Sequence, residues 1–237
     1  MIPWLSDTSL LFPDPNSALL EPDGLLAAGG DLSPERLIAA YRAGIFPWFS
    51  DEDPILWWSP NPRCVLKPEE IHISRSMKKH LRKASVQIKV DTAFTKVIQQ
   101  CATSRSDRQG TWITDEMMTA YKELHRRGIA HSIEVWQADQ LVGGLYGLSI
   151  GKLFFGESMF SLQPNMSKVA FITLASYLKE HGFPLIDCQV HNEHLVSLGA
   201  KNISRKEFLH YIDQYIDQEP GDIWSTFSAP TLNSERE

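Results

Sequence analysis

Three strand-length segments followed by one long helix are the feature that most constrains how this chain can fold. The segments cover residues 130–137, 141–150 and 152–161, and only short turns separate them. Turns of this length connect antiparallel neighbours in a sheet. Residues 165–181 then place apolar side chains at helical spacing, and Gly182 is typical of a helix end. The pattern predicts an antiparallel meander followed by a long amphipathic helix.

The remaining elements are shorter helices and strands. Three positions are typical of helix starts: Ser33, which Pro34 follows; Ser74; and Thr114, which two acids follow. With apolar periodicity, these signals predict helices over 34–43 and 92–102, helices beginning at 75 and 114, and a short helix at 193–198. They also predict strands over 55–60, 87–91 and 185–190, and a last strand and helix near 203. Elements in this order predict an α+β fold.

Composition divides the chain into two parts. Up to Pro62 it is rich in proline, glycine and tryptophan, and nine acids stand against Arg36 and Arg42. Pro60-Asn-Pro62 is the best candidate for a linker. We therefore predict a small, aromatic-rich N-terminal domain over residues 1–62 and a mixed-sheet domain over residues 63–237.

The composition is that of an ordinary globular protein, with 237 residues, 43% of them hydrophobic and 22% charged. The first residues lack the basic segment and apolar core of a signal peptide, and no apolar run approaches the roughly 18 residues that span a bilayer. Three cysteines argue against a disulfide framework, and Cys188 is expected to face away from its polar neighbours. We expect a cytoplasmic protein with no membrane partner and a disordered end at 232–237.

The net charge of −6 argues against DNA as a partner, but the charge is unevenly distributed. Residues 63–83 hold seven bases, Arg63 among them, against two acids. On the helix that begins after Ser74, four of these bases share one stripe and a fifth lies beside it: Arg75, Lys78, Lys79, Arg82 and Lys83. Such a stripe contacts nucleic-acid phosphates or is simply a solvated helix face.

Polar side chains lie inside two segments that are apolar enough to be buried strands. Glu157 lies in the third strand of the meander, and Asp187 and Gln189 lie two apart in the strand over 185–190. Burial of such groups without partners costs several kcal/mol. Each group also has a purely structural interpretation. Glu157 would pair with an internal lysine or arginine, and Asp187 and Gln189 would be a polar pair that satisfies the end of a strand. Gly156 permits a β-bulge that would aim Glu157 into a cleft.

The order of elements in residues 63–237 resembles the fold of the Gcn5-related N-acetyltransferases. In those enzymes a glycine-rich turn before the long helix binds the pyrophosphate of acetyl-CoA. Here residues 161–168 form this turn, which contains no glycine, and Pro164 removes one amide. A CoA thioester is therefore disfavoured as the donor. A CoA-dependent N-acetyltransferase is one hypothesis for this chain, and a non-enzymatic tRNA-binding module is another.

Motifs along nearly the whole chain are similar to those of leucyl/phenylalanyl-tRNA–protein transferases. They are Phe46-Pro-Trp-Phe49, Leu56-Trp-Trp-Ser-Pro60, Ser74-Arg-Ser76, Gly110-Thr-Trp-Ile-Thr114, Phe155-Gly-Glu-Ser-Met-Phe-Ser161 and Ile186-Asp-Cys-Gln189. One departure is Met166, where the family pattern has a small residue. The resemblance implies an acetyltransferase-like catalytic domain, a bacterial cytosolic enzyme and no dissociable cofactor or metal. Such an enzyme moves leucine, phenylalanine or, less well, methionine from aminoacyl-tRNA to the α-amine of proteins that begin with arginine or lysine, which marks them for N-end rule degradation.

The resemblance also implies roles for residues at matching positions. Asp187 and Gln189 lie at the reacting centre, where we interpret them as positioning the amine, and Glu157 binds the basic acceptor residue. The donor side chain enters an apolar pocket formed by Leu145, Phe154, Met159, Phe171, Leu174 and Ile186. Trp48 and Trp112 stack on the terminal adenine. The basic stripe, Arg75, Lys78, Lys79, Arg82 and Lys83, contacts the tRNA body.

Overall fold

The computed structural model describes residues 2–109 and 113–230, and within them the strands form two sheets. The smaller sheet has the order β1-β2-β4-β3 and the larger has the order β11-β5-β10-β9-β8-β7-β6. The strands are β1 (Trp4–Leu5), β2 (Leu25–Gly29), β3 (Phe46–Pro47), β4 (Leu56–Trp58), β5 (Arg63–Leu66), β6 (Gln87–Val90), β7 (Ala130–Gln137), β8 (Gln140–Ile150), β9 (Leu153–Ser161), β10 (Leu185–Gln189) and β11 (Lys201–Ile203). The predicted α+β class and mixed sheet are confirmed.

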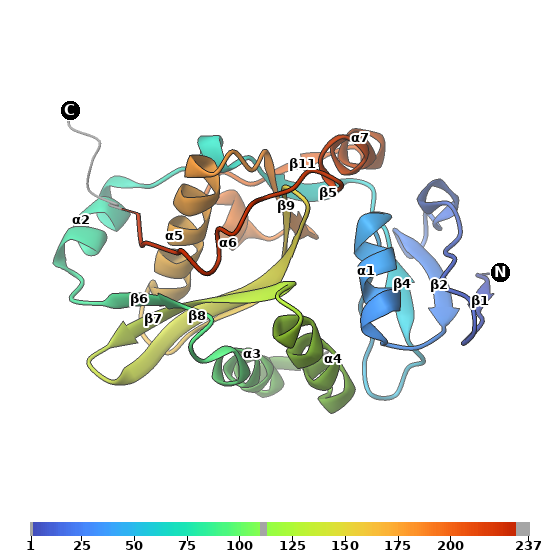
Figure 1. Ribbon diagram of the computed structural model, residues 1–237, viewed down its shortest axis with the longest axis horizontal. Helices are drawn as coiled ribbons and strands as arrows, with labels where there is room; N and C mark the ends of the chain where they lie inside the picture. The colour runs from blue at the N-terminus through green and yellow to red at the C-terminus, as the bar shows by residue number, and fades with distance from the viewer. Residues whose placement is uncertain (1, 110–112, 231–237) are drawn as a thin grey trace.

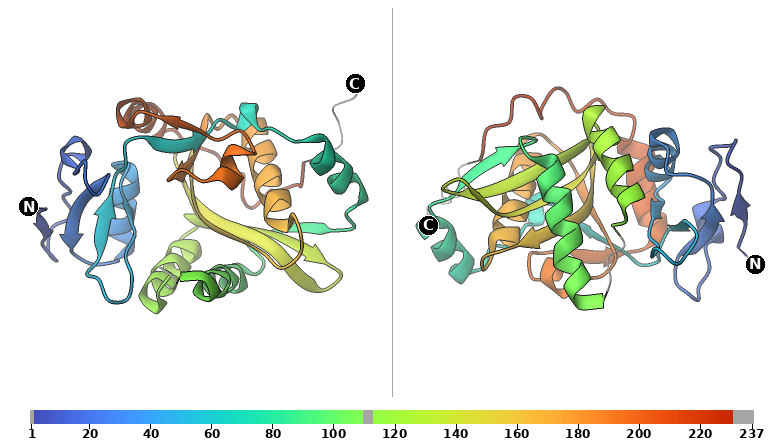
Figure 2. Two further views of the ribbon diagram at one scale, coloured as in Figure 1. Left: turned by 180° about the vertical axis from the view of Figure 1, so that it is seen from behind. Right: turned by 90° about the horizontal axis from the view of Figure 1, so that it is seen from below.

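Helices cover both faces of the larger sheet, as Figures 1 and 2 show. α3 and α4 lie on one face and α5 on the other. The helices are α1 (Pro34–Arg42), α2 (Arg75–Lys83), α3 (Phe94–Gln109), α4 (Asp115–Arg126), α5 (Met166–Glu180), α6 (Glu193–Val196) and α7 (Arg205–Tyr215), with 3-10 turns at Pro15–Ser17 and Pro68–Glu70. None of the described helices combines the length and apolarity needed to cross a bilayer.

Local capping chemistry explains where the helices begin. The hydroxyls of Ser33, Ser74 and Thr114 accept hydrogen bonds from backbone N–H groups three residues later, in the first turns of α1, α2 and α4. These three predicted starts are therefore confirmed. α3 extends beyond the predicted end at 102, and residues 110–112 and 232–237 lie outside the described part of the chain.

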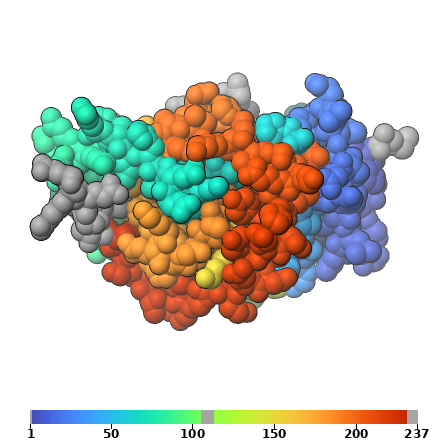
Figure 3. Space-filling model, turned by 90° about the horizontal axis from the view of Figure 1, so that it is seen from above, coloured from blue at the N-terminus to red at the C-terminus, as the bar shows by residue number. Residues whose placement is uncertain are grey.

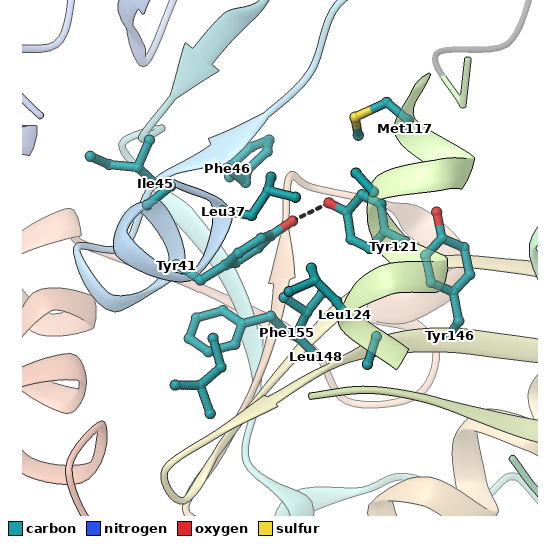
Figure 4. Packing of buried hydrophobic residues seen from close by; sticks show 14 of the residues in the cluster. Leu37, Tyr41, Ile45, Phe46, Met117, Tyr121, Leu124, Tyr146, Leu148 and Phe155 are labelled. Carbon is teal, nitrogen blue, oxygen red and sulfur yellow. Dashed lines mark hydrogen bonds between the residues drawn. The ribbon is translucent and has the colours of Figure 1, made fainter. Parts of the chain in front are cut away.

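A shared hydrophobic core joins the two sheets. Tyr41 of α1 and Phe46 of the smaller sheet pack in one cluster with Tyr121, Leu124 and Phe155 of the larger part (Figure 4). The larger sheet begins at β5, directly after the expected linker. Because the core crosses this point, the division at residue 62 stays a prediction.

The meander is confirmed, and it ends beside a parallel strand pair. β7, β8 and β9 are antiparallel, whereas β10 runs parallel to β9. This parallel pairing covers only Leu153–Phe155 of β9 and Leu185–Asp187 of β10. Beyond these residues β9 and β10 no longer pair with each other, and Glu157 and Gln189 lie in these diverging ends.

Candidate active site

A cavity of about 1040 Å³ lies where β9 and β10 stop pairing. One wall comes from the N-terminal part of the chain, between Phe46 and Trp58, and the other from β8, β9, α5, β10 and α6. Glu157, Asp187 and Gln189 all border it. The structure thus brings together the three polar residues that the sequence placed in buried strands.

A β-bulge turns Glu157 out of the regular strand. Tyr146 of β8 pairs with Ser158 and Gly147 with Gly156, so Glu157 is the extra residue on β9. Glycine is needed opposite the bulge, because a Cβ atom at Gly147 would lie 2.3 Å from the carbonyl oxygen of Phe155. The bulge expected beside Gly156 is therefore confirmed.

Glu157 is buried and is held by hydroxyl and amide donors. Tyr41 of α1 donates to Oε1 at 2.7 Å, and Tyr121 of α4 donates to Oε2 at 2.9 Å. The Nε2 atom of Gln189 donates to Oε1 at 2.8 Å. Burial raises the pKa of Glu157 to about 7, although these hydrogen bonds act in the opposite direction. None of the ion pairs among the described residues includes Glu157, so the predicted alternative of an internal cation is wrong.

Asp187, in contrast, forms an ion pair with a buried arginine. Arg63 of β5 donates from Nε to Oδ1 at 2.8 Å and from Nη2 to Oδ2 at 2.6 Å. Its guanidinium lies between the rings of Phe46 and Phe208, 4.7 and 4.4 Å from their centroids. Both charged side chains are almost fully buried. By sequence Arg63 is one of the seven bases of residues 63–83, but β5 buries it in the sheet, apart from the exposed stripe on α2.

Asp187 also fixes the backbone of Gln189. Its Oδ1 atom accepts a hydrogen bond from the N–H of Gln189 at 2.9 Å. Gln189 has a φ of 63°, in the left-handed region, which costs a residue with a side chain about 1–2 kcal/mol. The register against β5 shifts at this point, and Cys188 borders the cavity as well. Cys188 packs in the same core cluster as Ile186 and Cys64, whereas Asp187 pairs with Arg63 beside Phe46 and Phe208 of the other cluster, so the expectation that Cys188 faces away from Asp187 is confirmed.

Apolar side chains form one end of the cavity. Leu145, Phe154, Met159, Phe171 and Leu174 all line it. Ile186 was expected in this pocket as well, but it is not among the residues that line the cavity and pairs with Phe154 in the parallel part of the sheet. Met166 is also buried and lies outside the lining, where its Cβ packs against Gly143.

An aromatic rim borders the cavity on the N-terminal side. Trp48 is 43% exposed, and its ring centroid lies 5.6 Å from that of Trp58. Trp57 and Trp58 alternate on β4, as their spacing predicts for a strand: Trp57 is fully buried in the core, and Trp58 lines the cavity. Trp112 lies outside the described residues. The rim offers one exposed indole face for stacking.

The basic stripe is exposed and distant from the smaller sheet. All five of its members are exposed on α2: Arg75, Lys78, Lys79, Arg82 and Lys83. Met77 is buried on the other face of this helix. α2 and the N-terminal sheet lie at opposite ends of the molecule in Figures 1 and 3. The structure therefore places the stripe on the surface but does not bring it into the cavity.

Comparison with known proteins places this geometry in a family. The model of the leucyl/phenylalanyl-tRNA protein transferase family matches residues 65–213, and the model of its N-terminal domain matches residues 30–61. The chain belongs to this family. The leucyl/phenylalanyl-tRNA–protein transferase of Pseudomonas aeruginosa is 59% identical over 94% of this chain and 99% of its own length. That of Pseudomonas syringae is 57% identical over 95% and 98%.

This leucyl/phenylalanyl-tRNA–protein transferase family member is an aminoacyltransferase. Among solved structures, a GCN5-related N-acetyltransferase from Kribbella flavida aligns with a TM-score of 0.37 and 11% identity over 70% of this chain and 59% of its own. The family membership agrees with the resemblance seen in the motifs. It does not assign the individual side chains of the cavity.

Three residues of this transferase site escaped the sequence analysis. Tyr41, Tyr121 and Arg63 all lie at core positions, and each contacts a polar residue of the cavity. A signal was present for the tyrosines, because each lies four residues after an apolar residue on the inward face of its helix. A buried tyrosine hydroxyl requires a partner, and a buried carboxylate on another strand is such a partner.

Proposed function

We propose that this enzyme transfers leucine or phenylalanine, and less well methionine, from aminoacyl-tRNA to the α-amine of proteins that begin with arginine or lysine. The new N-terminal residue would mark the acceptor for degradation by the N-end rule pathway in the cytoplasm. The observation that carries the proposal is that one cavity joins an apolar pocket, an exposed indole and a carboxylate without a cation. These features match the donor side chain, the terminal adenine and the acceptor charge.

The acceptor side of the cavity is suited to a positive charge. Glu157 has four lone-pair positions when it is ionised, and Tyr41, Tyr121 and Gln189 occupy three of them. One position on Oε2 is left for the guanidinium of arginine or the ammonium of lysine. A charge-assisted hydrogen bond of this kind favours a basic first residue over a neutral one.

Gln189 is suited to hold the attacking amine. An ionised carboxylate only accepts hydrogen bonds, so Glu157 requires the NH₂ group of Gln189 to face it. The carbonyl oxygen of the same amide is then available to accept a hydrogen bond from the α-amine. The amine attacks the ester carbon, the C–N bond forms, and the bond to the ribose oxygen breaks. The ester is already activated, so alignment of the two groups supplies much of the rate.

Asp187 acts as a positioning residue in this proposal. Its carboxylate accepts two hydrogen bonds from Arg63 and one from the Gln189 backbone. A carboxylate in a buried pair with arginine is a weak base. The α-amine, with a pKa of about 8, is already partly the free base at neutral pH. Asp187 therefore serves to keep Gln189 in its left-handed conformation.

The competing hypothesis of a CoA-dependent enzyme receives no support from the turn before α5. The N–H of Ser167 donates to the hydroxyl of Ser161 at 3.1 Å, and the N–H of Met166 donates to the carbonyl of Gln163 at 3.3 Å. Two amides that would face a pyrophosphate are thus already bound within the chain. Acetyl-CoA is therefore expected to show no binding by calorimetry.

The proposed function is tested by transfer of labelled phenylalanine. The enzyme is incubated with labelled phenylalanyl-tRNA and with peptides that differ only in an N-terminal arginine, lysine or alanine. We expect label on the first two peptides and at least about tenfold less on the third, from the loss of one charge-assisted hydrogen bond. Equal labelling of all three peptides would contradict the proposed preference for basic N-terminal residues, and absence of label on all of them would contradict the proposed transfer reaction.

Charge reversal on α2 is expected to weaken binding of charged tRNA. Each cation that contacts a phosphate contributes about one unit to the slope of log affinity against log salt concentration. The double variant Arg75→Glu with Arg82→Glu should therefore flatten this slope by about two units. Binding is measured over a salt series. Lys179→Glu with Lys206→Glu, at two other exposed positions, gives the same change in net charge and serves as the control. A short aminoacyl-adenosine donor should be used equally well by all variants, and equal loss with this donor would contradict a contact with the tRNA body.

A further inference from the structure

Tyr41, Tyr121 and Glu157 form a closed ring of short oxygen contacts. The two phenol oxygens lie 2.5 Å apart, and each also lies within hydrogen-bond distance of one carboxylate oxygen, at 2.7 and 2.9 Å. Figure 4 shows the two hydroxyl groups pointing at each other from α1 and α4. Both tyrosines are fully buried and Glu157 is 7% exposed. The ring therefore forms without help from bulk water.

Counting protons shows which form of Glu157 completes this ring. With an ionised carboxylate, the two phenols have two protons for three oxygen contacts, so one short contact lacks a proton. If both phenols donate to the carboxylate, their own oxygens lie 2.5 Å apart with no hydrogen between them. A protonated Glu157 supplies the third proton, and every contact becomes a hydrogen bond.

The groups around the ring also favour the neutral form. Tyr41 comes from α1, Tyr121 from α4, Tyr146 from β8, and Asp187 and Gln189 from β10. Asp187 brings a negative charge that raises the pKa of Glu157, and Arg63 pairs with Asp187 rather than with Glu157. Burial raises the pKa values of both tyrosines above their usual range, so neither phenol is a source of negative charge.

We propose that the free enzyme holds Glu157 protonated within this ring, and that a cationic acceptor side chain displaces the proton into solvent when it binds. The inference rests on the proposed acceptor role of Glu157. The O–H bond of the carboxyl group breaks, the proton passes to water, and the carboxylate pairs with the guanidinium or ammonium. Both phenols then turn their protons toward the new carboxylate. Tyr41 and Tyr121 are thus positioning residues that link acceptor selection to pH.

The variant Glu157→Gln imitates the protonated state. An amide supplies one donor and one acceptor to the two tyrosines and still offers an oxygen to Gln189. This variant should fold normally, keep a closed ring and lose about 10- to 100-fold in affinity for an arginine-led peptide. Because a raised pKa makes folding stability fall as pH increases, the wild type should lose stability relative to this variant between about pH 5 and about pH 8.

The free enzyme tests the ring without any substrate. We expect a carboxylic-acid carbonyl band in the infrared difference spectrum between wild type and Glu157→Gln near neutral pH. Tyr41→Phe and Tyr121→Phe each open the ring that the neutral carboxyl group completes, so the band should disappear at lower pH in these variants than in wild type. Tyr177→Phe removes a buried hydroxyl that bonds the Ile223 carbonyl and should titrate as wild type. An absent band, or tyrosine variants that titrate like wild type, would overturn the proposal.

Addition of an arginine-led peptide tests the displacement. The band should disappear on saturation, and calorimetry in two buffers of different ionisation enthalpy should show more proton release for wild type than for Glu157→Gln. A band that survives saturation would overturn the displacement step. Failure of the proposed function is separable, because Glu157→Gln would then leave the acceptor KM unchanged in the phenylalanine-transfer assay, whatever the free-enzyme spectrum shows.

Discussion

Replacement of Arg63 by methionine is expected to lower the free energy of unfolding by about 3–5 kcal/mol, the cost of leaving a buried charge without its partner. Asp187 is 2% exposed and would lose both of its hydrogen bonds from the guanidinium. The Gly44 carbonyl would lose a donor as well. Urea unfolding measures the change, and phenylalanine transfer should fall together with stability because Asp187 holds Gln189.

The double variant Arg63→Met with Asp187→Asn separates the charge from the packing. Asparagine removes the buried negative charge but keeps an oxygen that can accept from the Gln189 N–H. We expect this variant to regain part of the lost stability. A double variant that is less stable than Arg63→Met alone would show that the charge pair is not the source of the loss. Arg42→Met breaks an exposed pair with Asp217 and should change stability by less than about 1 kcal/mol.

Local patterns in the sequence predict the elements around the cavity well. The caps of α1, α2 and α4, the meander and the bulge beside Gly156 all follow from residues that are close together in the chain. Cap chemistry and strand alternation act over a few residues, so a single sequence contains the necessary information. The same is true of Glu157, whose charge is conspicuous in an apolar strand.

The partners of these polar residues could not be predicted, because they come from distant parts of the chain. Tyr41 is 116 positions from Glu157, and Arg63 is 124 positions from Asp187. β5 has four buried residues in a row, so it lacks the alternation that marks a half-buried strand. Its first residue is an arginine that follows a proline-rich turn, so the sequence gives no sign that this charge is buried in a strand.

Gln189→Ala is expected to lower kcat/KM for transfer to an arginine-led peptide by about 100-fold, the usual effect of a misplaced reacting group. The alanine variant removes the amide that Glu157 holds at 2.8 Å, and with it the carbonyl oxygen proposed to position the amine. Stability should change little, because Gln189 lies at a strand end and borders the cavity. Single-turnover transfer with saturating phenylalanyl-tRNA measures the step directly.

Binding of charged tRNA distinguishes a role at the reacting centre from a structural one. The loss of Gln189 should leave the apolar pocket, the Trp48 rim and α2 in place, so tRNA affinity should stay within about twofold of wild type. Gln214→Ala, an exposed glutamine on α7, is the matched control and should leave both measurements unchanged. A parallel loss of tRNA affinity and transfer in Gln189→Ala would mean that this residue supports the wall of the cavity. Reduced transfer with unchanged tRNA affinity would place the Gln189 amide beside the attacking amine. The α-amine is the one substrate group toward which Glu157 is proposed to orient this amide.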